Sequence, residues 1–104
     1  MCPVYLGPLT SPAAAEVVAS KKARGAVVYA ETSAAAVILD GEEYWNQCWR
    51  HAASFLCSPP LRKGAADAMA KCAAEALDSV CSDHCTFNAK QRALGQDDFR
   101  EAIQ

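Results

Sequence analysis

Hydrophobic and polar positions along this chain fall into short blocks that predict strands and helices in turn. Apolar runs with no polar side are typical of strands buried in a parallel sheet, and blocks with helical spacing lie between them. In chain order, the pattern predicts a strand at 3–9, a helix at 10–25, a strand at 26–32, helices at 42–57 and 65–79, a short strand at 80–83, and helices at 88–95 and 96–104. Residues 33–41 fit either an extension of the second strand or a loop.

The ends of these elements carry the expected signals. Ser11 is a candidate N-cap of the first helix, Pro12 suits its first turn, and Gly25 suits its end. Pro59 and Pro60 cannot continue the helix at 42–57, so a break is expected there.

Aromatic residues with helical spacing mark the predicted helix at 42–57. Tyr44, Trp45, Trp49 and Phe55 fall largely on one face of it. This pattern predicts packing against the sheet or against a neighbouring subunit.

The order of elements is β-α-β-α-α-β-α-α, which predicts an α/β fold with a parallel sheet and right-handed connections. Functional groups in such folds gather where the strands end at their carboxyl side. We therefore expect Asp83 to lie at the carboxyl end of a buried strand, on the same rim as Pro8 and a turn at Glu31–Thr32. Ser58 should approach this rim, because the chain leaves a helix there.

Composition narrows the class of protein. The 104 residues are 52 % hydrophobic and 21 % charged, as expected for one globular unit. The net charge of −2 gives no sign of nucleic-acid or anionic-membrane binding. No apolar run reaches the roughly 20 residues that span a bilayer, and the amino terminus lacks the basic start of a secretory signal. A cytoplasmic protein is expected.

Six cysteines are many for this length. Without an export signal, free reduced thiols are expected in place of disulfides. Cys48, Cys57 and Cys72 fall within or at the end of helical patterns, which predicts that they act as small core residues.

The segment "CSDHC" at 81–85 leaves several interpretations open. Asp83 can accept backbone N–H groups of the following turn, as Asp often does at strand ends. Zinc at Cys81, His84 and Cys85 would need a fourth ligand that the chain does not offer nearby, and side chains of an extended segment diverge. The same divergence argues against Cys81 or Cys85 as a nucleophile activated by His84.

Four stretches, "CPVYL", "DGEEYW", "CSPPLR" and "SDHCTFNAKQRALGQDDF", together resemble the dihydropyrimidinase–hydantoinase family of cyclic amidohydrolases. This family includes the collapsin response mediator proteins, which share the fold without the hydrolase chemistry. The resemblance covers essentially the whole chain in matching order. "VYAET" and "SDH" favour the mediator-protein branch.

The resemblance implies a metal-dependent (β/α)8 barrel, of which this chain looks like the last three β/α units. Family enzymes use two zinc ions bridged by a carboxylated lysine, and this chain alone holds neither cofactor. Asp83 matches an aspartate that binds metal and carries a proton, and Ser58 matches a serine whose backbone contacts the substrate. Pro8 falls where a hydrolase has a metal-binding histidine.

Two functions are compatible with these observations. The first is a non-catalytic segment of a dihydropyrimidinase-related protein that acts through protein–protein contacts, as a homo-oligomer or hetero-oligomer with related proteins, and with cytoskeletal or signalling partners if mediator-like. The alternative is a segment of an active enzyme that hydrolyses cyclic amide C–N bonds in pyrimidine catabolism. Pro8 favours the first, because proline offers no metal ligand.

Overall fold

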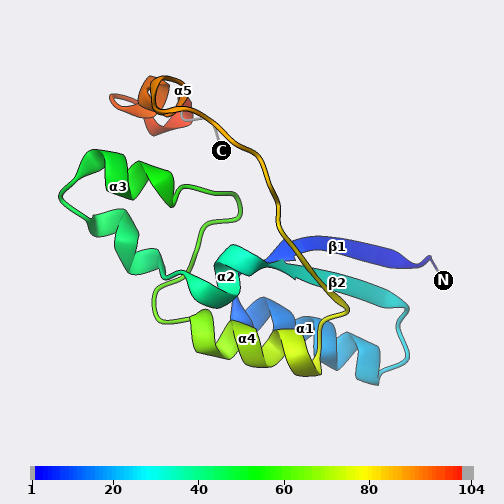
Figure 1. The fold of residues 1–104 in the computed structure, drawn as a ribbon. Helices are drawn as coiled ribbons and strands as arrows, with labels where there is room; N and C mark the ends of the chain where they lie inside the picture. Colours follow the sequence, from blue (N-terminus) through cyan, green and yellow to red (C-terminus); the bar gives the residue numbers. More distant parts are fainter. Residues whose placement is uncertain (1, 102–104) are drawn as a thin grey trace.

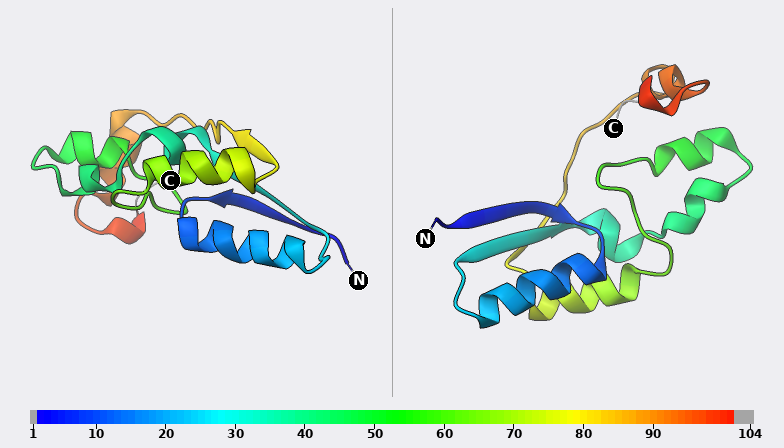
Figure 2. Two further views of the ribbon diagram at one scale, coloured as in Figure 1. Left: turned by 90° about the horizontal axis from the view of Figure 1, so that it is seen from below. Right: turned by 180° about the vertical axis from the view of Figure 1, so that it is seen from behind.

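A three-stranded parallel sheet forms the centre of the structure. The computed structural model describes residues 2–101. Strands β1 (Val4–Leu9), β2 (Val28–Ser33) and β3 (Ser79–Cys81) lie side by side in that order, and both neighbouring pairs run parallel. Figure 1 labels β1 and β2, and β3 is the yellow arrow in the left view of Figure 2. The α/β class and the parallel sheet predicted from the apolar runs are confirmed.

Two helices cover one face of this sheet. Helices α1 (Pro12–Ala23) and α4 (Ala66–Glu75) contact each other and lie on the same side of the strands (Figures 1 and 2). Pro12 begins α1, and Gly25 follows it with a φ of 84°, as predicted. Ser11 holds the N-cap position, but its side chain makes no capping bond.

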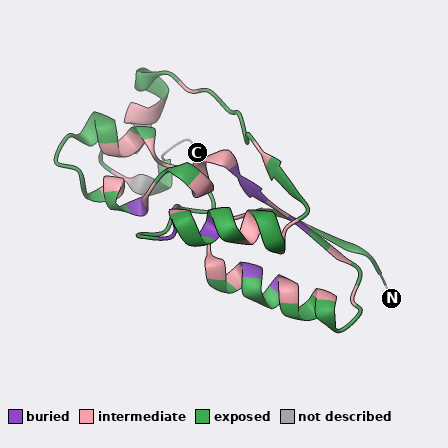
Figure 3. Cartoon of the chain, turned by 60° about the horizontal axis from the view of Figure 1, so that its bottom comes forward, coloured by how far each residue is buried: buried purple, intermediate pink, exposed green. Residues whose placement is uncertain are grey.

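The buried residues gather between this sheet and its helices (Figure 3). Ala15 and Val18 of α1, Ala30 and Thr32 of β2, and Met69 of α4 are all buried. Met69 is the largest apolar side chain that is fully buried, and such burial contributes about 1.5–3 kcal/mol. The core is therefore a thin layer of mostly small side chains.

A lysine of α1 fastens the two helices to the sheet. Lys22 Nζ donates to the carbonyl oxygen of Ala76 at 2.9 Å and pairs with the Asp78 carboxylate at 2.5 Å. The same carboxylate accepts the N–H of Ala30 at 2.8 Å. The Lys22 bond, followed by the Ala30 N–H, lowers the pKa of Asp78 below its ordinary value.

The opposite face of the sheet is open. Tyr5 is paired with Tyr29, and the two side chains are 60 % and 49 % exposed. The Tyr5 hydroxyl donates to a Glu31 carboxylate oxygen at 2.6 Å and lies 3.1 Å from the Ser79 hydroxyl, which links all three strands. The bond to Glu31 raises the pKa of the Tyr5 hydroxyl.

The prediction for residues 33–41 was wrong in both of its forms. A short helix, α2 (Ala34–Ile38), follows β2 directly. Its N-cap is Ser33, whose hydroxyl accepts the N–H of Ala36 at 3.2 Å. This capping bond marks the start of α2, which the run of alanines alone does not indicate.

The predicted long helix at 42–57 is divided in two. A 3₁₀ helix, η1 (Gly41–Trp45), is separated from α3 (Trp49–Ser54) by a bend in which the Asn46 side chain accepts the N–H of Cys48 at 2.9 Å. Asparagine competes for backbone groups in this way, which interrupts a helix.

The break also changes the surroundings of the aromatic residues and the cysteines. Trp45 is 86 % exposed, so the aromatic residues do not form one face packed against the sheet, and packing against a neighbouring subunit stays a prediction. Cys48 is exposed, and Cys57 and Cys72 are only half-buried. The prediction that these three cysteines are core residues was therefore wrong.

The last described part of the chain, residues 82–101, forms an arm that runs away from the sheet (Figure 1). Its first seven residues have no regular structure, and a single turn of helix, α5 (Ala89–Arg92), then packs against α3. The 3₁₀ helices η2 (Ala93–Gly95) and η3 (Phe99–Glu101) follow. The helix predicted at 88–95 is confirmed, whereas the one at 96–104 is a single 3₁₀ turn within the described residues, and residues 102–104 lie outside them.

Candidate functional site

A small cavity of about 80 Å³ lies where the strands end at their carboxyl side. It is lined by Pro8, Thr10, Ser33, Ala35, Cys57, Ser58, Pro59, Ser82 and Asp83. Segments far apart in the sequence meet here, because the carboxyl ends of parallel strands share one edge of the sheet. The prediction that Asp83, Pro8 and Ser58 come together on one rim is confirmed.

The predicted turn at Glu31–Thr32 is part of strand β2. Thr32 is fully buried, and its hydroxyl donates to the Leu9 carbonyl oxygen at 2.6 Å. Glu31 bonds Tyr5 on the open face of the sheet. Ser33, at the end of the strand, reaches the cavity in their place. The predicted strand at 26–32 ended one residue too early, because nothing in the run of alanines after Ser33 marks Ser33 as the cap of a helix.

Asp83 follows β3 in an unusual backbone conformation. Its φ of 47° lies in the left-handed region, where Asp and Asn are enriched among non-glycine residues. The expected buried strand is in fact an exposed edge, because Ser79 and Val80 are both exposed. Asp83 is itself exposed and turns towards the cavity from this edge.

The segment that follows Asp83 has no regular structure until the next helix begins. Helix α5 begins six residues later, and its N-cap is Asn88. The Asn88 side chain accepts the N–H of Gln91 at 2.9 Å, and the Gln91 side chain accepts the N–H of Asn88 at 2.9 Å, which forms a complete capping box. Asp83 is therefore not the cap of the following helix.

Hydrogen bonds hold the loop that carries Ser58 against the sheet. The Thr10 hydroxyl donates to the Pro60 carbonyl oxygen at 2.8 Å, and the Leu61 N–H donates to the Tyr44 hydroxyl at 2.9 Å. Gly41 lies so close that an added Cβ would stand 2.6 Å from the Leu61 carbonyl oxygen. These contacts hold the backbone just after Ser58 and so keep Ser58 at the carboxyl ends of the strands.

The cavity does not fit a two-metal centre by its own donors. Asp83 is the only carboxylate among its lining residues, and Pro8 has no ligand atom. Within residues 2–101, no group of three or more His, Cys, Asp or Glu side chains is arranged to hold a metal ion. The lining instead offers hydroxyl groups and one carboxylate, which can hydrogen-bond a small polar molecule or water.

The two histidines have other contacts. His84 Nε2 lies 3.1 Å from the Thr86 hydroxyl, and His51 Nε2 lies 2.5 Å from a Glu43 carboxylate oxygen. The thiol of Cys81 has its pKa raised by burial, then by Glu31 and Asp83. These surroundings do not activate Cys81 as a nucleophile.

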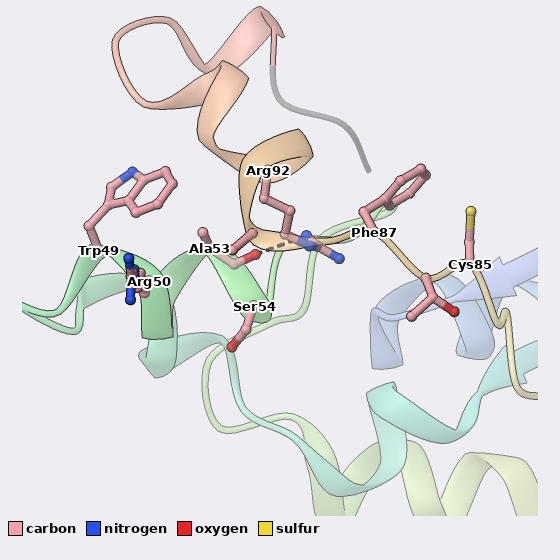
Figure 4. A pocket seen from close by; sticks show the side chains of 9 residues that line it. Trp49, Arg50, Ala53, Ser54, Cys85, Phe87 and Arg92 are labelled. Carbon is pink, nitrogen blue, oxygen red and sulfur yellow. Dashed lines mark hydrogen bonds between the residues drawn. The ribbon is translucent and has the colours of Figure 1, made fainter.

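A larger cavity of about 340 Å³ lies between α3 and the arm, and nothing in the sequence indicated it (Figure 4). Arg92 is its central residue: Nη1 donates to the carbonyl oxygens of Ala53 at 2.8 Å and Leu56 at 3.1 Å. The guanidinium group also lies 6.0 Å from the Phe87 ring centre. A lone arginine on a short helix carries no sequence signal for such distant partners.

Comparisons with known proteins agree with this geometry. No family model matches the chain. It is 46 % identical over 101 residues to dihydropyrimidinase of Rattus norvegicus, and the aligned region covers 94 % of this chain and 20 % of that protein. It is 42 % identical over 101 residues to dihydropyrimidinase-related protein 5 of Homo sapiens, and the aligned region covers 94 % of this chain and 18 % of that protein.

Solved structures give the same result. A D-hydantoinase (dihydropyrimidinase) from Thermus sp. matches with a TM-score of 0.90 at 27 % identity, over 98 % of this chain and 22 % of that one. A dihydropyrimidinase from Brevibacillus agri matches with a TM-score of 0.89 at 29 % identity, over 97 % of this chain and 22 % of that one. The chain thus spans about a fifth of the relatives it matches.

The chain is therefore homologous to one segment of the dihydropyrimidinases, hydantoinases and dihydropyrimidinase-related proteins, and the resemblance noted in its motifs is confirmed. Within residues 2–101, none of the helices has the length and apolar character needed to cross a bilayer.

Proposed function

We propose that the chain forms three consecutive β/α units of a (β/α)8 barrel. Three parallel strands in sequential order, with helices on one face only, are the arrangement of such a barrel wall. The open face, with Tyr5, Tyr29 and Glu31, corresponds in this proposal to the interior of the barrel.

We further propose that this segment does not support hydrolysis and acts through protein–protein contacts. The observation that carries the proposal is the cavity at the rim, where Pro8 lines the wall beside Ser58 and Asp83. By family resemblance, a hydrolase has a metal-binding histidine at the position of Pro8. A proline there leaves the Asp83 carboxylate without that neighbouring ligand.

Exposed surface supports a role in contacts with other proteins. Trp45 lies on η1, outside the sheet, and is 86 % exposed. Exposed apolar surface of this kind is typical of interaction sites when it is contiguous. Oligomers with related proteins are the partners we propose, in a cytoplasmic setting.

The alternative function is that of a segment of an active cyclic-amide hydrolase. The 46 % identity to a dihydropyrimidinase and the presence of Asp83 and Ser58 in one cavity favour it. In this alternative, the remaining ligands would come from other parts of the barrel, and a different residue or water would replace the histidine.

Ring opening and zinc content test the two functions. A complete barrel that contains this segment is incubated with zinc and either dihydrouracil or hydantoin, because the segment alone would lack the remaining ligands under both functions. Bound metal is measured after gel filtration. We expect no ring opening and no stoichiometric zinc, for the protein and for a matched Asp83→Asn variant alike. Zinc-dependent opening of either ring that Asp83→Asn abolishes would overturn the proposal in favour of the alternative.

A further inference from the structure

Two cysteines that the proposed function does not use line one cavity. This cavity, of about 280 Å³, lies between the loop after α3 and the start of the arm. It is lined by Leu56, Cys57, Ser58, Asp83, Cys85 and Arg92. The thiols of Cys57 and Cys85 come from segments that the sequence gives no reason to bring together.

Arg92 keeps these two segments in place. Its Nη1 bonds the carbonyl oxygen of Leu56, the residue directly before Cys57, and that of Ala53 one turn earlier. Its guanidinium also lies over Phe87, two residues after Cys85 (Figure 4). One side chain thus holds the backbone beside both thiols.

The other four cysteines, Cys2, Cys48, Cys72 and Cys81, do not line this cavity. Cys81 is the last residue of strand β3, and its backbone is held in the sheet by pairing with Ser33. Cys72 lines the groove between α1 and α4. Cys85 is exposed and Cys57 is half-buried, so both are open to a small oxidant.

We propose that Cys57 and Cys85 form a reversible disulfide that fastens the arm to the loop carrying Ser58. The bond requires Cα atoms about 4.4–6.8 Å apart. Residues 82–88 have no regular structure, so forming the bond breaks no helix or strand hydrogen bonds in this segment. The disulfide would fix Ser58 and Asp83 at the rim and reduce the motion of the arm, whether or not the barrel hydrolyses cyclic amides.

The reaction is thiol–disulfide exchange with a small disulfide such as oxidised glutathione. One protein thiolate attacks a glutathione sulfur, which forms a mixed disulfide and releases the first glutathione thiolate. The second protein thiolate attacks the protein sulfur of that mixed disulfide and releases the second. Two protein thiols are oxidised, one glutathione disulfide is reduced, and the two protons end on the released thiols.

Peptide mapping of the native 104-residue chain tests this pairing. The chain is equilibrated with oxidised glutathione, quenched by acid and alkylation, and cleaved after Lys and Arg and before Asp. Cys57 is then the single cysteine of peptide 51–62. Cleavage before Asp83 leaves Cys85 as the single cysteine of peptide 83–90, apart from Cys81. We expect 51–62 linked to 83–90 as the dominant product.

Matched variants and mixed chains sharpen the test. Cys57→Ser and Cys85→Ser should each lower the protein disulfide by at least about tenfold, because the partner thiol is at millimolar effective concentration only within one chain. Cys48→Ser should leave it unchanged. Isotope-labelled and unlabelled chains, mixed before oxidation, should give links only within one chain. Dominant links from Cys57 to another cysteine, links between chains, or glutathione on both thiols without a link would overturn the proposal.

Discussion

The sheet with its two helices and the pair formed by α3 and the arm are built on different principles. In the first, Ala15, Ala30 and Met69 are fully buried, and a lysine–aspartate pair fastens helix to strand. In the second, contact between α3 and α5 rests on Arg92, and both helices lack buried residues. The first region is stabilised by its own core, whereas the second depends on a few polar contacts.

The largest expected effect concerns association. If the open face and edges of the sheet normally meet other parts of a barrel, the isolated chain should not remain a monomer. Size-exclusion chromatography with light scattering should show oligomers or a broad distribution. A sharp monomer peak with a cooperative melt would contradict the barrel proposal and would make the sheet region self-sufficient.

Met69→Ala should strongly destabilise the sheet region. Met69 is fully buried, and removing such a side chain costs about 2–5 kcal/mol. Urea unfolding at fixed protein concentration, followed by circular dichroism, measures the change. Leu94→Ala in the arm is the matched control, because Leu94 is 57 % exposed and should change the free energy of unfolding by less than about 0.5 kcal/mol. If both variants lost the same free energy of unfolding, the claim that only the sheet region has its own core would be wrong.

Gly41→Ala should have the next largest effect. The new Cβ would stand 2.6 Å from the Leu61 carbonyl oxygen and 2.9 Å from the Arg62 carbonyl carbon, so backbone must move at a cost of about 1–3 kcal/mol. Gly7→Ala is the control, since nothing lies within 4 Å of its added Cβ. Hydrogen exchange of the loop at 58–63 should increase in the first variant only.

Acid should destabilise the sheet region through Asp78, which pairs with Lys22 of α1. The folded-state pKa of Asp78 is lowered from 3.8 by Lys22 and the Ala30 N–H, so its contribution is present above about pH 4 and is lost as the pH falls through the lower folded value. The pKa of Asp98 is also lowered, by Arg100, but this pair is local to the arm. Lys22→Met should reduce the acid dependence of unfolding, because only the Ala30 N–H then lowers the pKa of Asp78, whereas Arg100→Met should leave it unchanged.

This division also explains what the sequence could predict. The three strands, α1 and α4 follow from apolar runs and from Pro12 and Gly25, which act over a few neighbouring residues. The shared rim of Pro8, Ser58 and Asp83 follows from the parallel order of the strands.

The predictions of a loop or strand extension at 33–41 and of one long helix at 42–57 failed because of polar side chains that can bond either the backbone or other groups. Ser33 caps α2 where a loop or strand extension was expected, and Asn46 divides the helix at 42–57 by accepting a backbone N–H. The contact of Arg92 with α3 is long-range and leaves no periodic pattern. Such choices are decided by tertiary contacts, so a single sequence does not predict them.

The central claim of the proposed function is that Pro8 stands where, by family resemblance, a hydrolase has a metal-binding histidine, in the cavity that Ser58 and Asp83 also line. It is tested by replacing the matching segment of rat dihydropyrimidinase with this chain and measuring dihydrouracil ring opening in folded, size-checked protein. We predict a rate at least about 100-fold below that of the rat enzyme, since disturbing even groups around a metal ligand costs 10–100-fold. Pro8→His should restore it, and Asp83→Asn should abolish it again. A chimera with Pro8 that matches the rat enzyme, or a folded Pro8→His chimera that stays inactive, would contradict the account.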